Sequence, residues 1–516
     1  MKSPFFSRQT LTGSTAFLLY FDLAKLLIHL YTNAFAGYGI FRDELYYAAC
    51  SEHLSAGYVD QPPFSIFLLA VSRLMLGDSV FAIRFLPALA GAATVFLTGL
   101  MAREMGGGRF AQALASLASI VSLIYIAFDS IYSMNAFDIL FWALSSFILI
   151  RLIKTGDKKY WMHLGLVLGL GLLNKISVLW LGFGIFTGLI LTSERRWLRT
   201  EDPYTAGMIA FALFLPYILW NATHGMAHLE FIRNASAGKY SSQTPITFLL
   251  GQILIQNPAT LPLWLSGLAW FLFSREEKRF RMFGYLFIAV ILVLIINGHS
   301  KPEYASAVYS LLFAGGAVAL ERWLSAPTLR WLKPAYMALI VVGIGIAPMV
   351  IGILPVESYM RYAADLGITP STSEGKRLDK LPQFYADMFG WEDKAAAVAK
   401  VYHSLSAEDQ AKCAIYADNY GRCAAIDFYS KKYHLPRAIG GHNNYWVWGP
   451  HKNTGEVVII LGGDLKTKAE RFETVTIADT VHTEYAIPYE NDLPIYVCRN
   501  LKGSLKELWP MLKHYD

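Results

Sequence analysis

Two neighbouring carboxylates, Asp43 and Glu44, follow the first apolar segment of the chain in the stretch FRDELYYAAC. Two further carboxylates, Asp60 and Asp138, occur in the later segments GYVDQPP and SMNAFDILFW. A carboxylate that is partly shielded from water can act as a general base toward an acceptor hydroxyl or amine. These four residues are therefore candidates for proton transfer or for binding a polar ligand.

Basic residues occur in three other short polar segments between apolar runs. They are Lys175 in LLNKISVLW, Arg233 in HLEFIRN and Lys301 in GHSKPEY. Lys and Arg bind anionic phosphate and can stabilise it as it leaves. A carboxylate base combined with such cations suits the transfer of a group from a lipid phosphate to an acceptor.

Each candidate also has a simpler structural interpretation. Asp43 and Glu44 can cap a helix, because helix N-termini favour acidic side chains. Asp138 can merely end a helix, and each of the three cations can extend to lipid headgroups. All three cations, however, depart from the distribution of basic residues described below, which favours a functional interpretation.

The composition is that of a membrane protein. Of 516 residues, 54% are hydrophobic and 16% charged, against roughly 45–50% and 25% in soluble domains. Apolar runs dominate to about residue 354, and polar residues then return at ordinary density. We therefore expect a transmembrane domain over 1–354 and a soluble domain over 355–516.

About eleven apolar segments of the first domain are candidates for bilayer crossings, which need about 20 residues each. They lie near residues 11–35, 79–102, 110–128, 139–153, 160–174, 176–192, 204–220, 256–273, 282–298, 303–320 and 335–354. The first segment lacks a small-residue cleavage pattern, so we expect a retained helix rather than a signal peptide.

Basic residues are concentrated in alternate loops, for example Lys2 and Arg8, or Arg195, Arg196 and Arg199. By the positive-inside rule these loops are cytoplasmic. We therefore expect a cytoplasmic N-terminus, and an extracytoplasmic location for the candidate residues and the C-terminal domain. The net charge of +6 is explained by this bias, so no nucleic-acid partner is predicted.

The first outer segment has helical periodicity over Glu44–Leu54 and Phe64–Leu76, separated by the turn Gln61–Pro63. This pattern predicts two short helices along the membrane surface. They would hold the three carboxylates of the segment near one cavity.

The C-terminal part has the pattern of an α/β domain. KCAIYADNYG, PRAIGG and EVVIILGG are typical of strands, and AAIDFYSKKYHL of a helix. The alternation favours a small parallel sheet. Gly462 and Gly463 after a strand are too weak a motif to indicate phosphate binding. Cys413, Cys423 and Cys498 allow one disulfide bond in an oxidising compartment.

The segment HNNYWVWGPHK places Tyr445, Trp446 and Trp448 close together between polar residues. Such aromatic rings can stack on sugars, pack into the sheet or rest at the membrane interface. We expect packing in the core or at the interface.

Six segments occur in an order that resembles a known family. They are DELYY, GYVDQPP, LGDSVFAIRFLPALAGA, NAFDILFW, GLGLLNKISVLW and GHSKPEY. They resemble bacterial members of glycosyltransferase family 39, the protein O-mannosyltransferase-like branch of the GT-C superfold. They are similar also to the transferases that add aminoarabinose to lipid A. The resemblance extends over about residues 36–320.

The resemblance implies a multi-span, all-α GT-C membrane fold followed by the soluble α/β domain. It implies an integral enzyme of the bacterial inner membrane that transfers a sugar, usually with inversion, from a polyprenyl-phosphate carrier to an extracytoplasmic glycan, lipid or protein. Asp43 matches the family's catalytic base, with Glu44 as its orienting or helix-capping neighbour. Asp60 matches an acid of the donor or metal site, and Asp138 the acid of the second outer loop.

The cations have family counterparts as well. Lys175, Arg233 and Lys301 match positions that bind the lipid phosphate, and Tyr304 lies in the motif of Lys301. Some relatives hold a divalent metal, which Asp43 and Asp60 could bind here. No other cofactor is expected.

The chain differs from the lipid A transferases at two positions. Tyr46 stands where they carry an arginine, three residues after the first acid, and Gln61 stands where a lysine is common. Two phosphate contacts are therefore in doubt, or are supplied by the three cations.

Two alternative functions remain. A transporter or flippase of lipid-linked glycans would use similar helices and cations, but is expected to show related halves with broken helices, and the sequence has no internal repeat. A membrane-anchored binding protein needs no carboxylates facing a phosphate. Asp43→Asn separates the three functions, since only a transferase would lose turnover while keeping its donor affinity.

Overall fold

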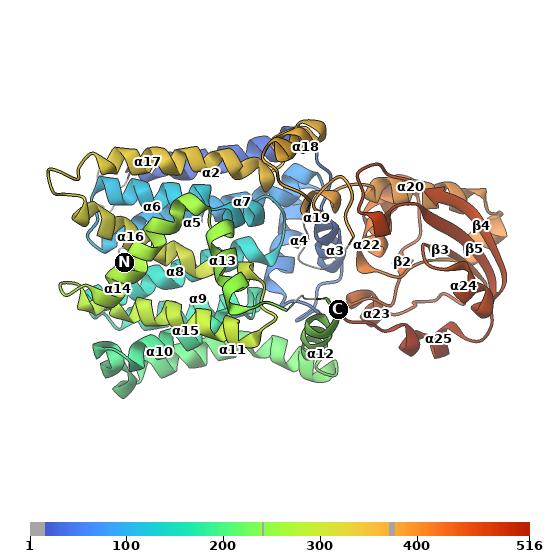
Figure 1. Ribbon diagram of the computed structural model, residues 1–516. Helices are drawn as coiled ribbons and strands as arrows, with labels where there is room; N and C mark the ends of the chain where they lie inside the picture. Colours follow the sequence, from blue (N-terminus) through green and yellow to red (C-terminus); the bar gives the residue numbers. More distant parts are fainter. Residues whose placement is uncertain (1–15, 240–241, 371–376) are drawn as a thin grey trace. The chain divides into compact units, whose positions relative to one another are not determined.

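A computed structural model describes residues 16–239, 242–370 and 377–516 of the chain. The chain divides into two compact units (Figure 1). The first unit comprises Met1–Ala36, Phe81–Leu219 and Ser242–Leu354, and the second comprises Gly37–Val80, Trp220–Ser241 and Pro355–Asp516. The predicted domains and the two compact units both have a boundary after residue 354. The compact units differ from the prediction because Gly37–Val80 and Trp220–Ser241 belong to the same unit as the C-terminal segment. The division into two domains at that residue stays a prediction.

The first unit is entirely helical in its described residues. Its helices are α2 (Leu18–Phe35), α5 (Val80–Glu104), α6 (Arg109–Val121), α7 (Leu123–Asp129), α8 (Met134–Thr155), α9 (Lys159–Asn174), α10 (Val178–Ile190), η2 (Ser193–Arg199), α11 (Asp202–Thr223), α13 (Pro245–Ile255), η4 (Pro258–Thr260), α14 (Leu261–Phe273), η5 (Lys278–Phe280), α15 (Arg281–Asn297), η6 (Pro302–Val308), α16 (Tyr309–Trp323), α17 (Leu332–Val342) and η7 (Gly343–Met349). The last residues of α11 are grouped with the second unit.

The described residues contain six helices long and apolar enough to cross a membrane, or up to nine if each of three bent pairs is one span. All of these coincide with predicted crossings. The two remaining predicted crossings fall on α2 and α9, which are helical, but the described part of α2 is too polar and α9 is too short. The expected number of about eleven crossings is therefore not confirmed. Lys2 and Arg8 lie outside the described residues.

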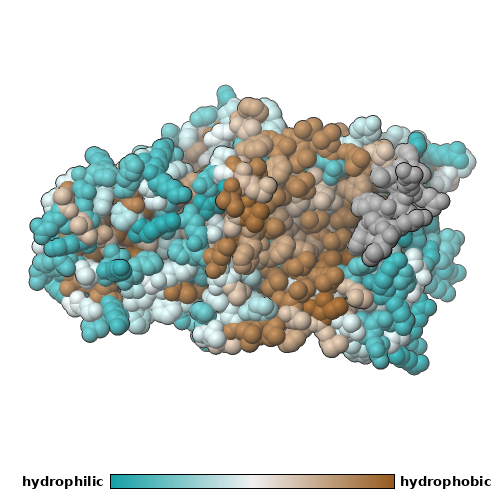
Figure 2. All heavy atoms as spheres, turned by 180° about the vertical axis from the view of Figure 1, so that it is seen from behind, coloured by the Kyte–Doolittle hydropathy of each residue, from teal (hydrophilic) through white to brown (hydrophobic). Residues whose placement is uncertain are grey.

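Small residues let the helices of the first unit pack closely. A Cβ atom at Gly316 of α16 would lie 2.0 Å from the carbonyl oxygen of Leu263 on α14, and one at Gly267 would lie 2.3 Å from that of Leu312. Only glycine allows backbones to approach this closely, as in other membrane helix pairs. The outer faces are apolar, with Phe211, Ile296 and Val342 more than half exposed. Figure 2 shows such residues merging into a broad hydrophobic surface.

The second unit combines short helices with one sheet. Its helices are α3 (Arg42–Glu52), α4 (Phe64–Leu76), α12 (Ala227–Asn234), η3 (Ala235–Lys239), α18 (Val356–Asp365), α19 (Gln383–Ala386), α20 (Trp391–Ser404), α21 (Ala407–Lys412), α22 (Tyr420–Tyr433), α23 (Asn444–Trp448), α24 (Leu465–Arg471), η8 (Pro488–Glu490), α25 (Leu505–Leu508) and η9 (Trp509–Leu512). The strands are β1 (Cys413–Ala417), β2 (Ala438–Ile439), β3 (Val457–Leu461), β4 (Phe472–Val481) and β5 (Leu493–Leu501). Helices α3 and α4 confirm the two short helices predicted for the first outer segment.

The five-stranded sheet has the order β2-β1-β3-β5-β4. Strands β2, β1 and β3 are parallel, as predicted, but β5 pairs antiparallel with both β3 and β4. The expectation of a parallel sheet is therefore wrong for these two strands. The edge strand β4 is mostly exposed, so it lacks the continuous apolar run that identifies a buried strand.

All four cysteines are buried free thiols, so the disulfide that the sequence allows is not formed. Two of the clustered aromatic residues pack as expected. Tyr445 is buried and donates its hydroxyl proton to Asp427, and the Trp446 indole N–H donates to the carbonyl of Trp509.

Candidate functional site

Asp43 and Glu44 lie in the first turn of α3 and differ in their surroundings. Glu44 is buried and accepts a hydrogen bond of 2.8 Å from the backbone N–H of Phe41, which caps the helix. Asp43 instead accepts from Tyr420 Oη at 2.8 Å and from Arg42 Nε at 3.2 Å. Both contacts are to Oδ1, and 37% of the side chain is exposed. A hydroxyl group can therefore approach the Asp43 carboxylate.

Arg42 is held as a permanent cation beside Asp43. Its guanidinium lies 3.4 Å from a carboxylate oxygen of Asp387, donates to Tyr489 Oη at 3.0 Å and stacks over the ring of Tyr420. Burial alone would lower the pKa of Arg42, but Asp387, Tyr420 and Asp43 together raise it well above its usual value. The Arg42 guanidinium therefore places a fixed positive charge 3.2 Å from Asp43 Oδ1.

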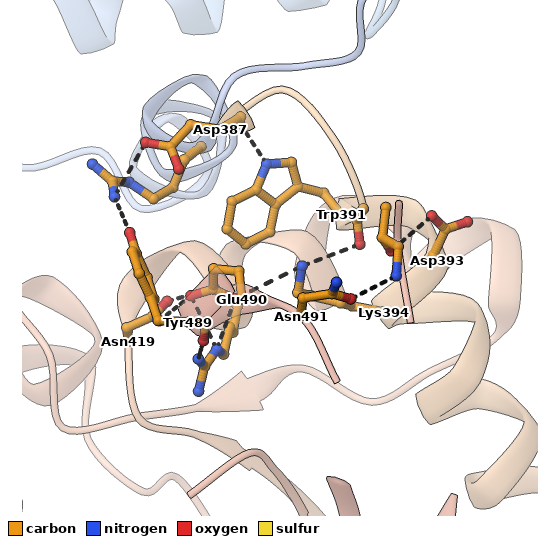
Figure 3. Close-up of polar contacts among 12 residues, drawn as sticks. Asp387, Trp391, Asp393, Lys394, Asn419, Tyr489, Glu490 and Asn491 are labelled. Carbon is orange, nitrogen blue, oxygen red and sulfur yellow. Dashed lines mark hydrogen bonds and ion pairs between the residues drawn. The ribbon is translucent and has the colours of Figure 1, made fainter. Parts of the chain in front are cut away.

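A buried charge network fixes the start of α22 and hence the position of Tyr420 (Figure 3). Glu490 accepts from Asn419 Nδ2 at 2.8 Å and from Arg422 Nε at 3.0 Å, and Lys394 Nζ lies 3.7 Å away. Burial raises the pKa of Glu490, but Arg422 and Lys394 outweigh it and the pKa is lowered. Asn419 in turn caps α22 by accepting from the backbone N–H of Arg422.

Asp60 is linked to the same region through aromatic residues. Tyr46 Oη donates to Asp60 Oδ1 at 3.0 Å and accepts from Asn444 Nδ2 at 2.6 Å. The Tyr46 ring packs against the Tyr420 ring, with 4.7 Å between centroids. Two neighbouring tyrosines therefore connect the acids at 43 and 60. Burial and the charge of Asp60 raise the pKa of Tyr46 well above its usual value, so this hydroxyl stays protonated.

Gln61, next to Asp60, is buried, and within the described residues neither its amide oxygen nor its amide nitrogen has a hydrogen-bond partner. Buried amides are nearly always satisfied by protein, water or ligand. Gln61 is therefore a candidate contact for a bound molecule.

Arg233 lies on α12 with an exposed side chain. Its helix is attached to the segment of Asp60, because His228 Nδ1 lies 3.0 Å from the carbonyl oxygen of Val59. Burial lowers the pKa of His228, so the imidazole is neutral and donates this hydrogen bond. The structure thus places Arg233 in the same unit as Asp43, without a direct contact to the acids among the described hydrogen bonds and ion pairs.

The remaining predicted residues lie in the first unit. Asp138, in the first turn of α8, is buried and contacts Lys175 Nζ at 3.4 Å and Ser177 Oγ at 2.7 Å. Lys175 also donates to Asn135 Oδ1 at 2.7 Å, and its ammonium lies 5.7 Å from the centre of the Tyr304 ring. Lys175 therefore points into a polar cluster of the protein instead of extending to lipid.

Lys301 precedes η6, and its carbonyl oxygen accepts from the backbone N–H of Tyr304 at 3.0 Å. Tyr304 packs against Trp180, with ring centroids 6.0 Å apart. The motif of Lys301 therefore contributes the aromatic ring of the Lys175 cluster.

The predicted residues thus form two sets, one in each unit. Asp43, Glu44, Asp60 and Arg233 belong to the second unit, and Asp138, Lys175, Lys301 and Tyr304 to the first. Sequence reasoning missed Tyr420 and Asn444, which are far from α3 in the chain and belong to no recognisable motif. It also missed Asn135, although its spacing of three residues from Asp138 places both on one helix face.

Within the described residues, one group of three side chains could hold a metal ion, namely His442, His514 and Asp516. His442 Nδ1 accepts from the backbone N–H of Tyr420 at 3.4 Å, which leaves the proton on Nε2, facing Asp516. This arrangement disfavours a metal ion on Nε2. Asp43 and Asp60 belong to no such group of three, and a metal at these two acids stays a prediction.

Comparisons with known proteins show which proteins this chain resembles. Residues 60–220 match the family described as dolichyl-phosphate-mannose-protein mannosyltransferase. An undecaprenyl phosphate-alpha-4-amino-4-deoxy-L-arabinose arabinosyl transferase of Pseudomonas fluorescens is 26% identical over 273 residues, covering 49% of this chain and 48% of that protein. The chain therefore spans about half the length of this curated relative.

The crystal structure of ArnT from Cupriavidus metallidurans bound to undecaprenyl phosphate is similar, with a TM-score of 0.63 and 13% identity over 94% of this chain and 98% of that one. The chain has the GT-C fold. The apo structure of the same ArnT gives a TM-score of 0.62 at 14% identity, over the same shares of the two chains. The chain is therefore an integral membrane protein with the GT-C fold, similar over part of its length to the mannosyltransferase family and to an aminoarabinose transferase.

Proposed function

We propose that this GT-C protein is an inverting glycosyltransferase, which moves a sugar from a polyprenyl-phosphate carrier to an acceptor on the outer face of the bacterial inner membrane. The observation that carries the proposal is the setting of Asp43. Its carboxylate is partly exposed and paired with Arg42, and its Oδ1 accepts a hydrogen bond from Tyr420. This is what a general base for an acceptor hydroxyl requires.

In the proposed reaction, Asp43 takes the proton of the acceptor hydroxyl as its oxygen attacks the anomeric carbon. The bond from that carbon to the phosphate oxygen breaks, and its electron pair leaves with the polyprenyl phosphate. One displacement of this kind inverts the anomeric centre and needs no covalent enzyme intermediate. Lys175, Arg233 and Lys301 are the proposed ligands of the phosphate, whose charge increases as it leaves.

The other residues have supporting roles in this proposal. Glu44 caps α3 and so orients Asp43, while Asp60 contributes to the donor site with the unsatisfied amide of Gln61 beside it. Asp138 orients Lys175. The N-terminus would be cytoplasmic, the second unit extracytoplasmic, and the acceptor a glycan, lipid or protein of the cell envelope.

The test is mass spectrometry of the purified protein incubated with polyprenyl-phosphate sugars and a cell-envelope extract. Wild type is compared with Asp43→Asn and with Asp78→Asn, a similarly exposed carboxylate paired with Arg73. We expect an acceptor to gain one sugar unit with wild type and Asp78→Asn, but not with Asp43→Asn. Unchanged turnover by Asp43→Asn would exclude this base. Transport of a lipid-linked sugar without transfer would support the flippase alternative.

A further inference from the structure

A cavity of about 430 Å³ lies within the second unit, beside the aromatic cluster of α23. Three separate segments line it: the end of α3 with the following loop, the end of α11, and α23. Its volume falls in the range of small-molecule sites, roughly 300–1,000 Å³. The proposed reaction assigns no role to this cavity.

Two stacked pairs of rings contribute to its walls. His53 and Trp448 stack with centroids 4.3 Å apart and an interplanar angle of 22°, and Trp220 and His224 stack at 4.2 Å and 14°. Burial and the nearby Arg437 lower the pKa of His53, so this imidazole is a neutral aromatic ring. The cavity therefore offers two flat aromatic walls, each stiffened by a second ring.

Fixed polar groups complete the lining. Glu52 is paired with Arg73 at 2.9 Å and with Arg437, and although burial opposes its charge, the two arginines lower its pKa. Asn444 accepts from the backbone N–H of Val59 at 3.2 Å and donates to Tyr46, the partner of Asp60. One residue therefore belongs both to the cavity wall and to the network around the predicted acids.

We infer that this cavity binds a pyranose ring of the acceptor glycan, an inference that rests on the proposed function. A pyranose has a C–H face, which stacks on aromatic rings, and a rim of hydroxyls, which bond to carboxylate and amide groups. The arginines nearest to the cavity are already paired with Glu52, so the cavity is unsuited to the phosphate of the donor. An acyl chain offers no hydrogen-bonding group to Glu52 and Asn444, whereas a pyranose hydroxyl can add to the bonds that these two residues already make.

The inference also accounts for the segment HNNYWVWGPHK. Its first two aromatic residues, Tyr445 and Trp446, pack within the protein, whereas Trp448 lines the cavity. Gly449 ends α23 directly after Trp448 with φ of 84°, a conformation that favours glycine. The C-terminal domain thus supplies one wall of the acceptor subsite.

The experiment measures binding of methyl hexopyranosides and methyl N-acetylhexosaminides to the full chain in detergent. Saturation-transfer NMR and tryptophan fluorescence report binding, and all proteins carry Asp43→Asn so that no turnover occurs. We expect saturable binding of at least one glycoside, weakened roughly tenfold or more by Trp448→Ala and largely retained by Trp448→Phe. Trp331→Ala, which removes an exposed indole of the first unit, should leave binding unchanged.

His224→Ala provides a second variant on the opposite stacked pair, in case Trp448→Ala unfolds the protein, which a thermal melt would reveal. Equal binding by wild-type and altered cavities, or no saturable binding of any glycoside, overturns the inference. Because the assay needs neither donor nor transfer, its result is separate from that of the mass-spectrometric test. If glycosides bind in a Trp448-dependent way but the mass-spectrometric test finds no sugar transfer, the proposed reaction is wrong and the inference of a carbohydrate-binding cavity still holds.

Discussion

Two carboxylates near the starts of helices, Asp43 in the second unit and Asp138 in the first, have opposite environments. Asp43 is 37% exposed, and its contacts with Tyr420 and Arg42 both go to one carboxylate oxygen, Oδ1. Asp138 is buried, and its two oxygens are engaged by Lys175 and Ser177. Acids predicted from similar sequence contexts therefore suit different tasks. Asp43 can take a proton from a ligand, whereas Asp138 can only hold a neighbouring cation in place.

The largest expected effect is on kcat, which substitution of Asp43 should lower far more than substitution of Asp138. Asp43→Asn should lower kcat by roughly 10²–10⁴-fold, because a general base contributes about that much. Its KM for the lipid-linked donor should change little, as judged by initial rates and donor titration. The same loss of kcat in Asp138→Asn, at unchanged KM, would break the comparison.

The Lys175 cluster should affect binding more than proton transfer. Lys175→Met should raise the KM for the donor by roughly 10- to 100-fold, because a charged hydrogen bond to phosphate is worth about 1.5–3 kcal/mol. Asp138→Asn should give a smaller increase, since Lys175 keeps Asn135 as a partner. Lys154→Met, whose ammonium pairs with Glu104, is the control. Donor titrations that show no change in Lys175→Met would remove this residue from the phosphate site.

The buried network behind Tyr420 should affect stability. Glu490→Gln removes the carboxylate that pairs with buried Lys394 and leaves Arg422 with Asp418 alone, and breaking a buried ion pair typically costs about 3 kcal/mol or more. We expect a lower melting temperature together with reduced turnover, because α22 carries Tyr420. Glu484→Gln, which affects a more exposed ion pair with Lys380, should leave both unchanged. A stable and fully active Glu490→Gln protein would show that the network does not position Tyr420.

Removal of the Tyr420 hydroxyl should show how much this contact contributes to the function of Asp43. Tyr420→Phe removes the hydroxyl that holds Asp43 Oδ1 in position, so kcat/KM should fall by roughly tenfold. Tyr433→Phe is the matched control, since this tyrosine of the same helix bonds to Glu392 instead. An unchanged kcat/KM in Tyr420→Phe would show that the tyrosine does not position Asp43.

A third carboxylate, Asp427, is buried like Asp138. Burial raises its pKa to about 7, against the lowering effects of the Ala438 backbone N–H and of Arg437. The folded protein therefore binds a proton that the unfolded chain releases near pH 4, and stability should decrease as the pH rises from about 4 to 7. Thermal melts of wild type and Asp427→Asn should diverge over this range. Parallel curves would contradict the raised pKa.

The helices could be predicted from the sequence because apolar length alone identifies a candidate span. The same holds for α3 and α4, whose periodicity is local. Contacts of Asp43 with Tyr420, and of Tyr46 with Asn444, could not be predicted, because their partners are 377 and 398 residues apart. The capping role of Glu44 could be predicted from the position of the helix start alone. The partners of Lys175 could not, because they depend on how three elements pack together.

Strand β4 shows a further limit of sequence analysis. Its exposed residues give neither an apolar run nor a regular alternation, and its pairing with β5 is set by the sheet as a whole. The number of crossings stays a prediction for a different reason. Polar side chains inside α2, such as Lys25 paired with Asp129, are satisfied by other helices and not by lipid.

The hydrogen bond between Asp43 and Tyr420 can form only late in the synthesis of the protein. A ribosome has translated every apolar span before it reaches the codon for residue 420, because the last of these helices ends at Met349. A nascent chain with all these spans translated would thus hold Asp43 without its Tyr420 contact. Maturation of the protein would end with the folding of α22, and chains truncated before that helix would lack this contact.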